Sequence, residues 1–239
     1  MKVGLTGFSG AGKTAVFAAL TGLEPQPGER RPLIATIKVP DARVDRLVEI
    51  HHPKKTTYAE VTFVDFPPGR DTTKRAVLDA DATAALRDAD ALVEVVRSFP
   101  DVAGAAPTPA VDIEAFDTEL ALADLSQIEK RLERMRKEKG HEREIALFER
   151  LTTTLEAGRA LRTMDLTAEE RAGLAGFAFL SLRPLLIVLN VENGDLGGSP
   201  IWTRPHNLLF DLSGCGKKVP AALSHRRPGR EQVLVPAVY

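Results

Sequence analysis

The chain has 239 residues, of which 44% are hydrophobic and 27% are charged, and this balance is typical of an ordinary soluble globular protein. Its formal net charge of −1 excludes a general attraction to nucleic acid or to an anionic membrane. The single cysteine, Cys215, excludes an internal disulfide and suits a reducing compartment. No apolar run has the length of a signal peptide or a membrane span, so we expect a cytoplasmic protein that binds neither membrane nor DNA.

The first elements of the chain are a short strand, a glycine-rich loop and a helix. Residues 2–6 predict a buried strand, and residues 15–20 predict the start of a helix. Between them, residues 7–14 read Gly-Phe-Ser-Gly-Ala-Gly-Lys-Thr and fit the P-loop pattern of Gly, four residues and Gly-Lys-Ser/Thr. The backbone N–H groups of such a loop surround phosphate oxygens, its lysine neutralises them, and its hydroxyl binds Mg²⁺.

This loop predicts a site for ATP or GTP together with Mg²⁺. Lys13 is expected to stabilise charge during hydrolysis, and Thr14 is expected to be a metal ligand. The predicted nucleotide-binding residues of the loop are Gly7, Ser9, Gly10, Ala11, Gly12, Lys13, Thr14 and Ala15.

Strands and helices continue to alternate after the loop. The further predicted strands are 33–39, 60–65, 91–96, 184–190 and 208–212. The further predicted helices are 41–50, with Asp41 as its N-cap, and about 74–88. This alternation favours an α/β fold, a mostly parallel sheet with helices on both faces.

The middle of the chain departs from this rhythm. Gly140 separates two runs with coiled-coil spacing, namely Leu122, Leu125, Ile128, Leu132 and Met135, and then Ile145, Phe148, Leu151 and Leu155. We predict an antiparallel helical hairpin that projects from the nucleotide domain, with two ordinary core helices as the alternative. The expected domains are a nucleotide-binding domain at 1–116 and 180–214, an inserted coiled-coil hairpin at 117–179, and an irregular basic tail at 215–239.

Several segments together resemble the YchF branch of the Obg-related P-loop GTPases. Residues 112–114 and 118–125 are similar to the segment that enters the coiled-coil insertion of that family, and residues 40–45, 63–65 and 95–99 match as well. The resemblance covers residues 1–214 and implies a nucleotide switch associated with ribosomes or translation, which hydrolyses ATP as readily as GTP or prefers it. The resemblance also implies a C-terminal TGS domain in family members, and we expect no such domain within these 239 residues. The tail from Cys215 is consistent with a truncated or frame-shifted end and equally with a divergent one.

The resemblance implies further residues of the magnesium and γ-phosphate site. Asp65 would hold Mg²⁺ through water, and Thr36 would complete the coordination as the switch threonine. Pro68 stands where the family has a glycine whose N–H senses the γ-phosphate, and proline has no N–H. Gly69 is therefore the expected substitute. The alternatives are a plain strand-ending Asp65 and a surface Thr36.

Residues 190–193, Asn-Val-Glu-Asn, occupy the base-reading position. The family has Asn, two residues and Glu, whereas here Asn193 takes the fourth place and Glu192 stands one position early. The lost charged acceptor would cost guanine about 1.5–3 kcal/mol, so ATP is expected to bind at least as well as GTP. Asn190 is expected to contact the base or the loop, with a simple strand-end residue as the alternative.

These departures, together with the absence of a catalytic glutamine after Asp65, predict slow turnover. Residues 130–139, from Lys130 to Lys139, have six basic and two acidic side chains near the hairpin tip and are a candidate contact for ribosomal RNA, with a solvated helix face as the alternative. The leading prediction is a Mg²⁺-dependent nucleoside triphosphatase that acts as a switch. Its rivals are a nucleotide-binding module with little or no hydrolysis, a P-loop kinase, and a remnant that keeps only the fold.

Overall fold

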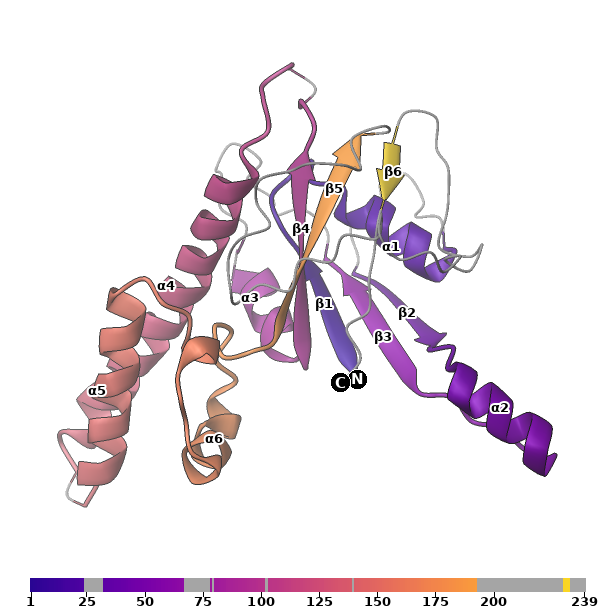
Figure 1. Ribbon diagram of the computed structural model, residues 1–239. Helices are drawn as coiled ribbons and strands as arrows, with labels where there is room; N and C mark the ends of the chain where they lie inside the picture. Colours follow the sequence, from indigo (N-terminus) through magenta and orange to yellow (C-terminus); the bar gives the residue numbers. More distant parts are fainter. Residues whose placement is uncertain are drawn as a thin grey trace.

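A six-stranded sheet organises the protein, with the strand order β2-β3-β1-β4-β5-β6 (Figure 1). The computed structural model describes residues 1–23, 32–66, 78, 80–101, 103–138, 140–192 and 230–232. The strands are β1 (Lys2–Thr6), β2 (Leu33–Lys38), β3 (Glu60–Asp65), β4 (Ala91–Ser98), β5 (Leu185–Glu192) and β6 (Arg230–Gln232). The four central strands are parallel, and β2 and β6 pair antiparallel at the two edges. The predicted mostly parallel α/β sheet is therefore confirmed.

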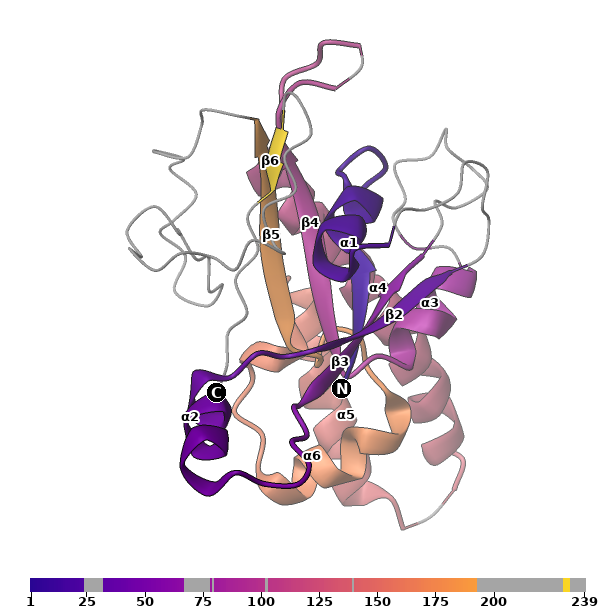
Figure 2. The same cartoon turned by 90° about the vertical axis from the view of Figure 1, so that its right-hand side faces the viewer.

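Helices cover both faces of this sheet (Figures 1 and 2). Successive side chains of a strand point to opposite faces, so the apolar strands expose apolar side chains on both faces that the helices bury. On one face, α1 (Lys13–Thr21) buries Val16 and Phe17 against residues that include Leu5 and Val95. On the other face, α3 (Ala80–Arg87) and α4 (Pro109–Met135) pack on Leu92. The predicted strand at 208–212 and the predicted start of α3 near residue 74 lie outside the described residues.

The helix α2 (Ala42–His51) stands apart at the end of the β2–β3 arm (Figure 1). Its predicted N-cap is present, since the Asp41 carboxylate accepts a hydrogen bond of 2.8 Å from the Arg43 N–H. None of its residues is buried.

The long helix α4 serves both the sheet and a helical unit beside it. Its N-terminal half packs on the sheet through Phe116 and Leu120. Its C-terminal half is followed by a turn, in which Gly140 has φ 95°, and then by α5 (Glu142–Glu156). The domain boundary expected at residue 117 thus falls inside one continuous helix.

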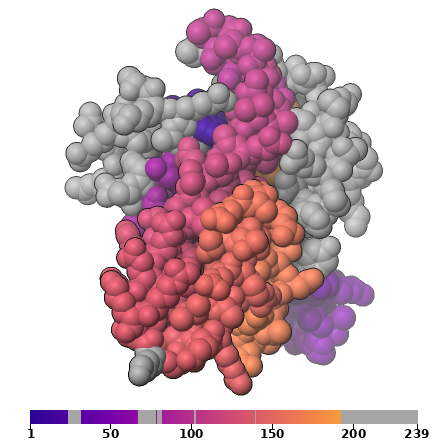
Figure 3. Space-filling model, turned by 90° about the vertical axis from the view of Figure 1, so that its left-hand side faces the viewer, coloured from indigo at the N-terminus to yellow at the C-terminus, as the bar shows by residue number. Residues whose placement is uncertain are grey.

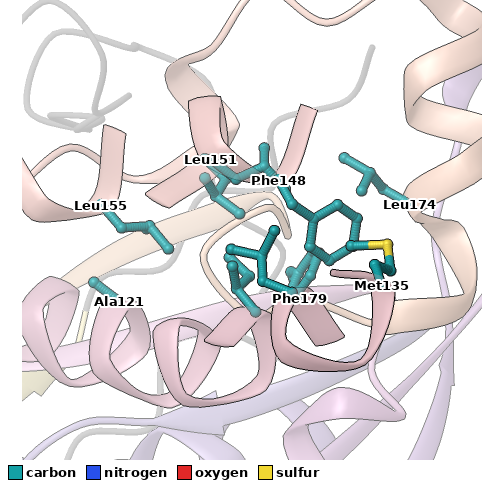
Figure 4. Packing of buried hydrophobic residues seen from close by; sticks show 10 residues of the cluster. Ala121, Met135, Phe148, Leu151, Leu155, Leu174 and Phe179 are labelled. Atoms are coloured by element: carbon teal, nitrogen blue, oxygen red, sulfur yellow. The ribbon is translucent and has the colours of Figure 1, made fainter. Parts of the chain in front are cut away.

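The helical unit has a third layer that the sequence did not indicate. The chain returns across α4 and α5 through the 3-10 turns η1 (Leu161–Thr163) and η2 (Ala175–Phe177), with α6 (Ala168–Leu174) between them (Figure 3). Leu161, Leu174 and Phe179 join the apolar cluster between α4 and α5 (Figure 4). The buried side chains of this third layer complete a small apolar core that belongs to the helical unit.

One member of the predicted seam is wrong. Leu122 is 60% exposed, and Ala121 is buried in its place. Two steps of three residues lead from Leu122 through Leu125 to Ile128. Over these six residues the helix rotates by about 600°, which is less than two full turns. The pattern 121, 125, 128, 132, 135 alternates steps of four and three and keeps to one face.

No helix within the described residues is long and apolar enough to cross a membrane.

Candidate functional site

The loop between β1 and α1 is shaped by two glycines in which a side chain would collide with the sheet. Gly7 has φ 130°, and a Cβ there would lie 2.3 Å from the Val95 carbonyl oxygen. Gly12 has φ 94°, and a Cβ there would lie 2.2 Å from Nδ2 of Asn190. Both positions therefore require glycine for space as well as for backbone conformation.

The closed loop leads directly into the first turn of α1. The Ala11 N–H donates to the Phe8 carbonyl at 3.2 Å, and the Val16 N–H donates to the Gly12 carbonyl at 2.9 Å. The N–H groups before Val16 in this first turn have no acceptor within the helix. Together with the positive end of the helix dipole they form an anion-binding site, at which Ser9 and Gly10 are exposed.

The Lys13 side chain folds back over the same loop. Its ammonium donates to the carbonyl oxygens of Gly7 at 2.7 Å and Phe8 at 3.1 Å. Burial lowers the pKa of Lys13, and the charge of Asp65 opposes that shift. A phosphate bound in the loop would add negative charge beside this amine and favour its protonated form.

Thr14 and Asp65 meet beneath the loop. The Thr14 hydroxyl donates to Oδ2 of Asp65 at 2.7 Å, and Asp65 is 3% exposed at the end of β3. Burial raises the pKa of Asp65, and the hydrogen bond from Thr14 and the charge of Lys13 oppose that shift. Oδ1 of Asp65 is buried and has no hydrogen-bond partner among the described residues.

These two side chains fit a magnesium site. An unpartnered carboxylate oxygen beside a hydroxyl supplies the hard oxygen donors that Mg²⁺ prefers. The described residues hold no group of three or more His, Cys, Asp or Glu side chains that could bind a metal. A Mg²⁺ ion here would therefore take its remaining ligands from nucleotide phosphates and water, as this ion commonly does.

Thr36 does not belong to this group. In the antiparallel β2–β3 pair, Leu33 is opposite Asp65 and Thr36 is opposite Thr62. Three strand residues separate Thr36 from the level of Asp65, about 10 Å along the sheet. Its hydroxyl instead lies 2.9 Å from the Thr62 hydroxyl. The expectation that Thr36 is a metal ligand is wrong for this conformation, because the strand register carries it away from the loop.

Asn190 contacts the P-loop, which is one of the two roles expected for it. It is 1% exposed near the end of β5, and its Nδ2 donates to the Ala11 carbonyl at 2.9 Å. Glu192 closes β5 and its backbone pairs with Arg230. The side chain of Glu192 and the whole of Asn193 and Gly69 lie outside what the structure describes.

Two groups of buried charges escaped the sequence analysis. Glu94 is fully buried in β4, and neither of its carboxylate oxygens has a partner within the described residues. Arg87 and Asp124 form an ion pair between α3 and α4. The available signal was a charged residue inside an otherwise apolar strand or helix stripe, at Glu94 and at Asp124.

A strand, a glycine-rich loop and a helix that bring a lysine, a hydroxyl and an acid together define a P-loop nucleotide-binding site. No family model matches the chain. The chain is 33% identical over 215 residues to "Ribosome-binding ATPase YchF" of Escherichia coli O157:H7, covering 83% of this chain and 59% of that protein. It is 28% identical over 212 residues to the protein of the same name from Bacillus subtilis, covering 82% and 58%.

A solved structure agrees with these relatives. The YchF GTPase of Schizosaccharomyces pombe superposes with a TM-score of 0.67 at 26% sequence identity, over 81% of this chain and 57% of that one. The chain belongs to the YchF subfamily of Obg-related P-loop GTPases. It spans less than two thirds of the length of these relatives.

Proposed function

We propose that this protein is a Mg²⁺-dependent P-loop nucleoside triphosphatase that hydrolyses ATP, GTP or both and acts as a nucleotide switch. The observation that carries the proposal is the 2.7 Å hydrogen bond between Thr14 and Asp65, next to the Lys13 ammonium. This is the set of groups that phosphoryl transfer needs, since catalysis there consists of positioning and charge neutralisation. The names of the relatives, an ATPase and a GTPase, support it.

Each residue of the site has a role that follows from its chemistry. The loop N–H groups and Lys13 would hold the β- and γ-phosphates, and Lys13 would stabilise the charge that develops as the γ-phosphate is cleaved. Thr14 would bind Mg²⁺ directly and Asp65 through water, and Mg²⁺ supplies neutralisation of the phosphate oxygens. Gly69 would offer its N–H to the γ-phosphate. Without a glutamine to orient water, turnover would be slow.

The base preference follows from position 193 and not from Asn190. One N–H of the Asn190 side-chain amide donates to the Ala11 carbonyl, so this donor supports the loop. With Asn193 in place of an acid, guanine would lack a charged acceptor, and ATP would bind at least as well as GTP. Competition between the two nucleotides tests this, and a preference for GTP of about tenfold or more, or about 1.4 kcal/mol, would reject it.

The ribosome is the proposed partner, as in the name of the relatives, and would place the protein in the cytoplasm. The candidate surface is a basic strip near the end of α4, made of Lys130, Arg134 and Lys137. These three residues are exposed, lie at spacings of four and three, and make no ion pair with any described residue. Such unpaired cations suit contacts to RNA phosphates.

Charge reversal tests this strip. Lys130→Glu, Arg134→Glu and Lys137→Glu together should abolish cosedimentation with ribosomes. Arg136→Glu is the matched control, because Arg136 is also exposed but is already paired with Glu149 at 3.0 Å. Equal pelleting of the triple variant and the wild type would reject the strip as the contact.

Thr14 tests the nucleotide site itself. Thr14→Ala removes the metal-binding hydroxyl and should abolish the gain in nucleotide affinity that Mg²⁺ gives, whereas Thr14→Ser should keep it. Thr36→Ala is the control, since Thr36 lies away from the loop. Affinity that depends on Mg²⁺ to the same degree in Thr14→Ala and the wild type would contradict the proposed role.

A further inference from the structure

Two described residues that follow Asp65 in the chain lie against an apolar cluster to which α4 contributes. Phe66 and Leu78 both pack on the apolar cluster that contains Phe116 and Leu120 of α4. The Leu78 N–H also donates to Oε2 of Glu119 at 3.0 Å. Phe66, directly after the proposed magnesium ligand Asp65, therefore lies against this cluster, and Leu78 is hydrogen-bonded to α4.

The helix α3 then ends in a cation that ties it to the helical unit. Nη1 of Arg87 lies 3.4 Å from Oδ1 of Asp124 and donates to the Ala178 carbonyl at 3.1 Å. Its Nη2 donates to the Ala123 carbonyl at 3.2 Å. One guanidinium thus bridges α3, α4 and the segment that leads into β5.

Asp124 is the anionic centre of this junction. It is fully buried, and it accepts hydrogen bonds from the N–H groups of Leu180 at 3.0 Å and Ser181 at 2.7 Å and from the Ser181 hydroxyl at 2.7 Å. On the other side, Nη2 of Arg183 donates to the Arg87 carbonyl at 3.0 Å. A buried charge that loses its partner is costly, so a displacement of α3 would carry α4 with it.

A strained residue marks the same place. Ala178, whose carbonyl Arg87 binds, has φ 51°, one of two positive φ values among described non-glycine residues. Ala178 lies between Phe177 and Phe179, whose rings stack at 5.5 Å in the core of the helical unit. Such a conformation persists only where its surroundings hold it, so the Arg87 contact reaches directly into that core.

We propose that Arg87 couples the nucleotide site to the helical unit, so that a displacement of α3 on nucleotide binding moves the C-terminal half of α4 and α5. This rests on the proposed nucleotide switch, in which γ-phosphate contacts reorder the residues after the magnesium site. Arg87 is a positioning residue here, because it contacts neither nucleotide nor metal ligand. The output would be the presentation of the basic strip, which lies on the end of α4 and on the turn that follows it.

Hydrogen exchange of the full chain, with and without Mg²⁺ and a non-hydrolysable ATP analogue, tests the coupling. In the wild type the analogue should slow exchange at residues 7–20 and change exchange in residues 124–156 by about fivefold or more. In Arg87→Met the change at 124–156 should disappear while slowing at 7–20 remains. Arg150→Met, which removes the ion pair between Arg150 on α5 and Glu170 on α6, should respond like the wild type.

The outcomes separate the two proposals. A response of residues 124–156 that persists in Arg87→Met, or a wild-type response confined to the P-loop, would overturn the coupling and leave the nucleotide site intact. No slowing at residues 7–20 in the wild type would overturn both. Arg87→Lys, which keeps the charge but has one nitrogen in place of the two that Arg87 uses, is a milder variant that should also reduce the response.

Discussion

The hydroxyl of Thr14 donates a 2.7 Å hydrogen bond to Oδ2 of Asp65, although 51 positions separate the two residues in the sequence. The sheet brings them together because β1 and β3 are parallel neighbours in which Leu5 is opposite Asp65. Parallel strands end at the same edge of a sheet, where open α/β folds bind their ligands. The loop after β1 and the acid that ends β3 therefore form one site.

Gly12 is expected to tolerate no side chain, because a Cβ would meet Nδ2 of Asn190 at 2.2 Å. Gly12→Ala should lower nucleotide affinity by more than about tenfold, or about 1.4 kcal/mol, as the loop shifts away from Asn190. Gly10→Ala is the matched control, since Gly10 also has a positive φ, 78°, but no described atom lies within 4 Å of its Cβ position. Equal losses in the two variants, measured by titration with a fluorescent nucleotide, would contradict the steric account.

Asn190→Ala should weaken ATP and GTP by the same factor. The change leaves the buried Ala11 carbonyl without its donor, which costs about 1–3 kcal/mol and disturbs the loop and not the base. Separate dissociation constants for the two nucleotides would measure this. A loss for one base that exceeds the loss for the other by tenfold would show that Asn190 reads the base.

Glu94 should make the protein less stable as the pH rises. Burial, and to a lesser degree the charges of Asp117 and Asp112, raise its pKa from 4.5 to about 9 against the opposing charge of Arg162. The folded state thus keeps a proton that the unfolded chain releases above its ordinary pKa. The contribution of Glu94 to the free energy of unfolding is therefore fully present below pH 4.5 and is lost as the pH rises toward 9.

Glu94→Gln removes this titration. Between pH 5 and pH 8 the variant should gain about 4 kcal/mol in free energy of unfolding relative to the wild type, because each pH unit between the two pKa values is worth about 1.4 kcal/mol. Urea unfolding of both proteins at the two pH values checks it. Parallel pH profiles would mean that Glu94 titrates normally, against the burial seen in the structure.

The P-loop and the central strands could be predicted from the sequence because they depend on neighbours along the chain. The pattern from Gly7 to Thr14 fixes its own shape, and the apolar runs of β1, β3 and β5 match their sequence ranges closely. Asp65 was recognised for a similar reason, as an acid at a strand end. Asp41 was recognised from its place at the start of α2.

The residues that were missed or misplaced depend on pairing across the fold. The register of β2 against β3 places Thr36 away from Asp65, and a local sequence pattern does not determine the register of two strands. Ala121 replaces Leu122 in the core because helix phase, not hydrophobicity, decides which residue faces α5. The partners of Asp124 lie 37 to 57 positions away, so only the structure unites them.

Phosphate release from ATP and from GTP in the presence of Mg²⁺, compared between the wild type and Lys13→Ala, tests the central claim most directly. The account predicts slow release by the wild type that requires Mg²⁺, is not faster with GTP than with ATP, and disappears in Lys13→Ala. Release that is the same in Lys13→Ala would show that another activity is being measured. Absence of release from the wild type, with nucleotide bound through Lys13, would contradict the proposed hydrolysis and leave a binding module.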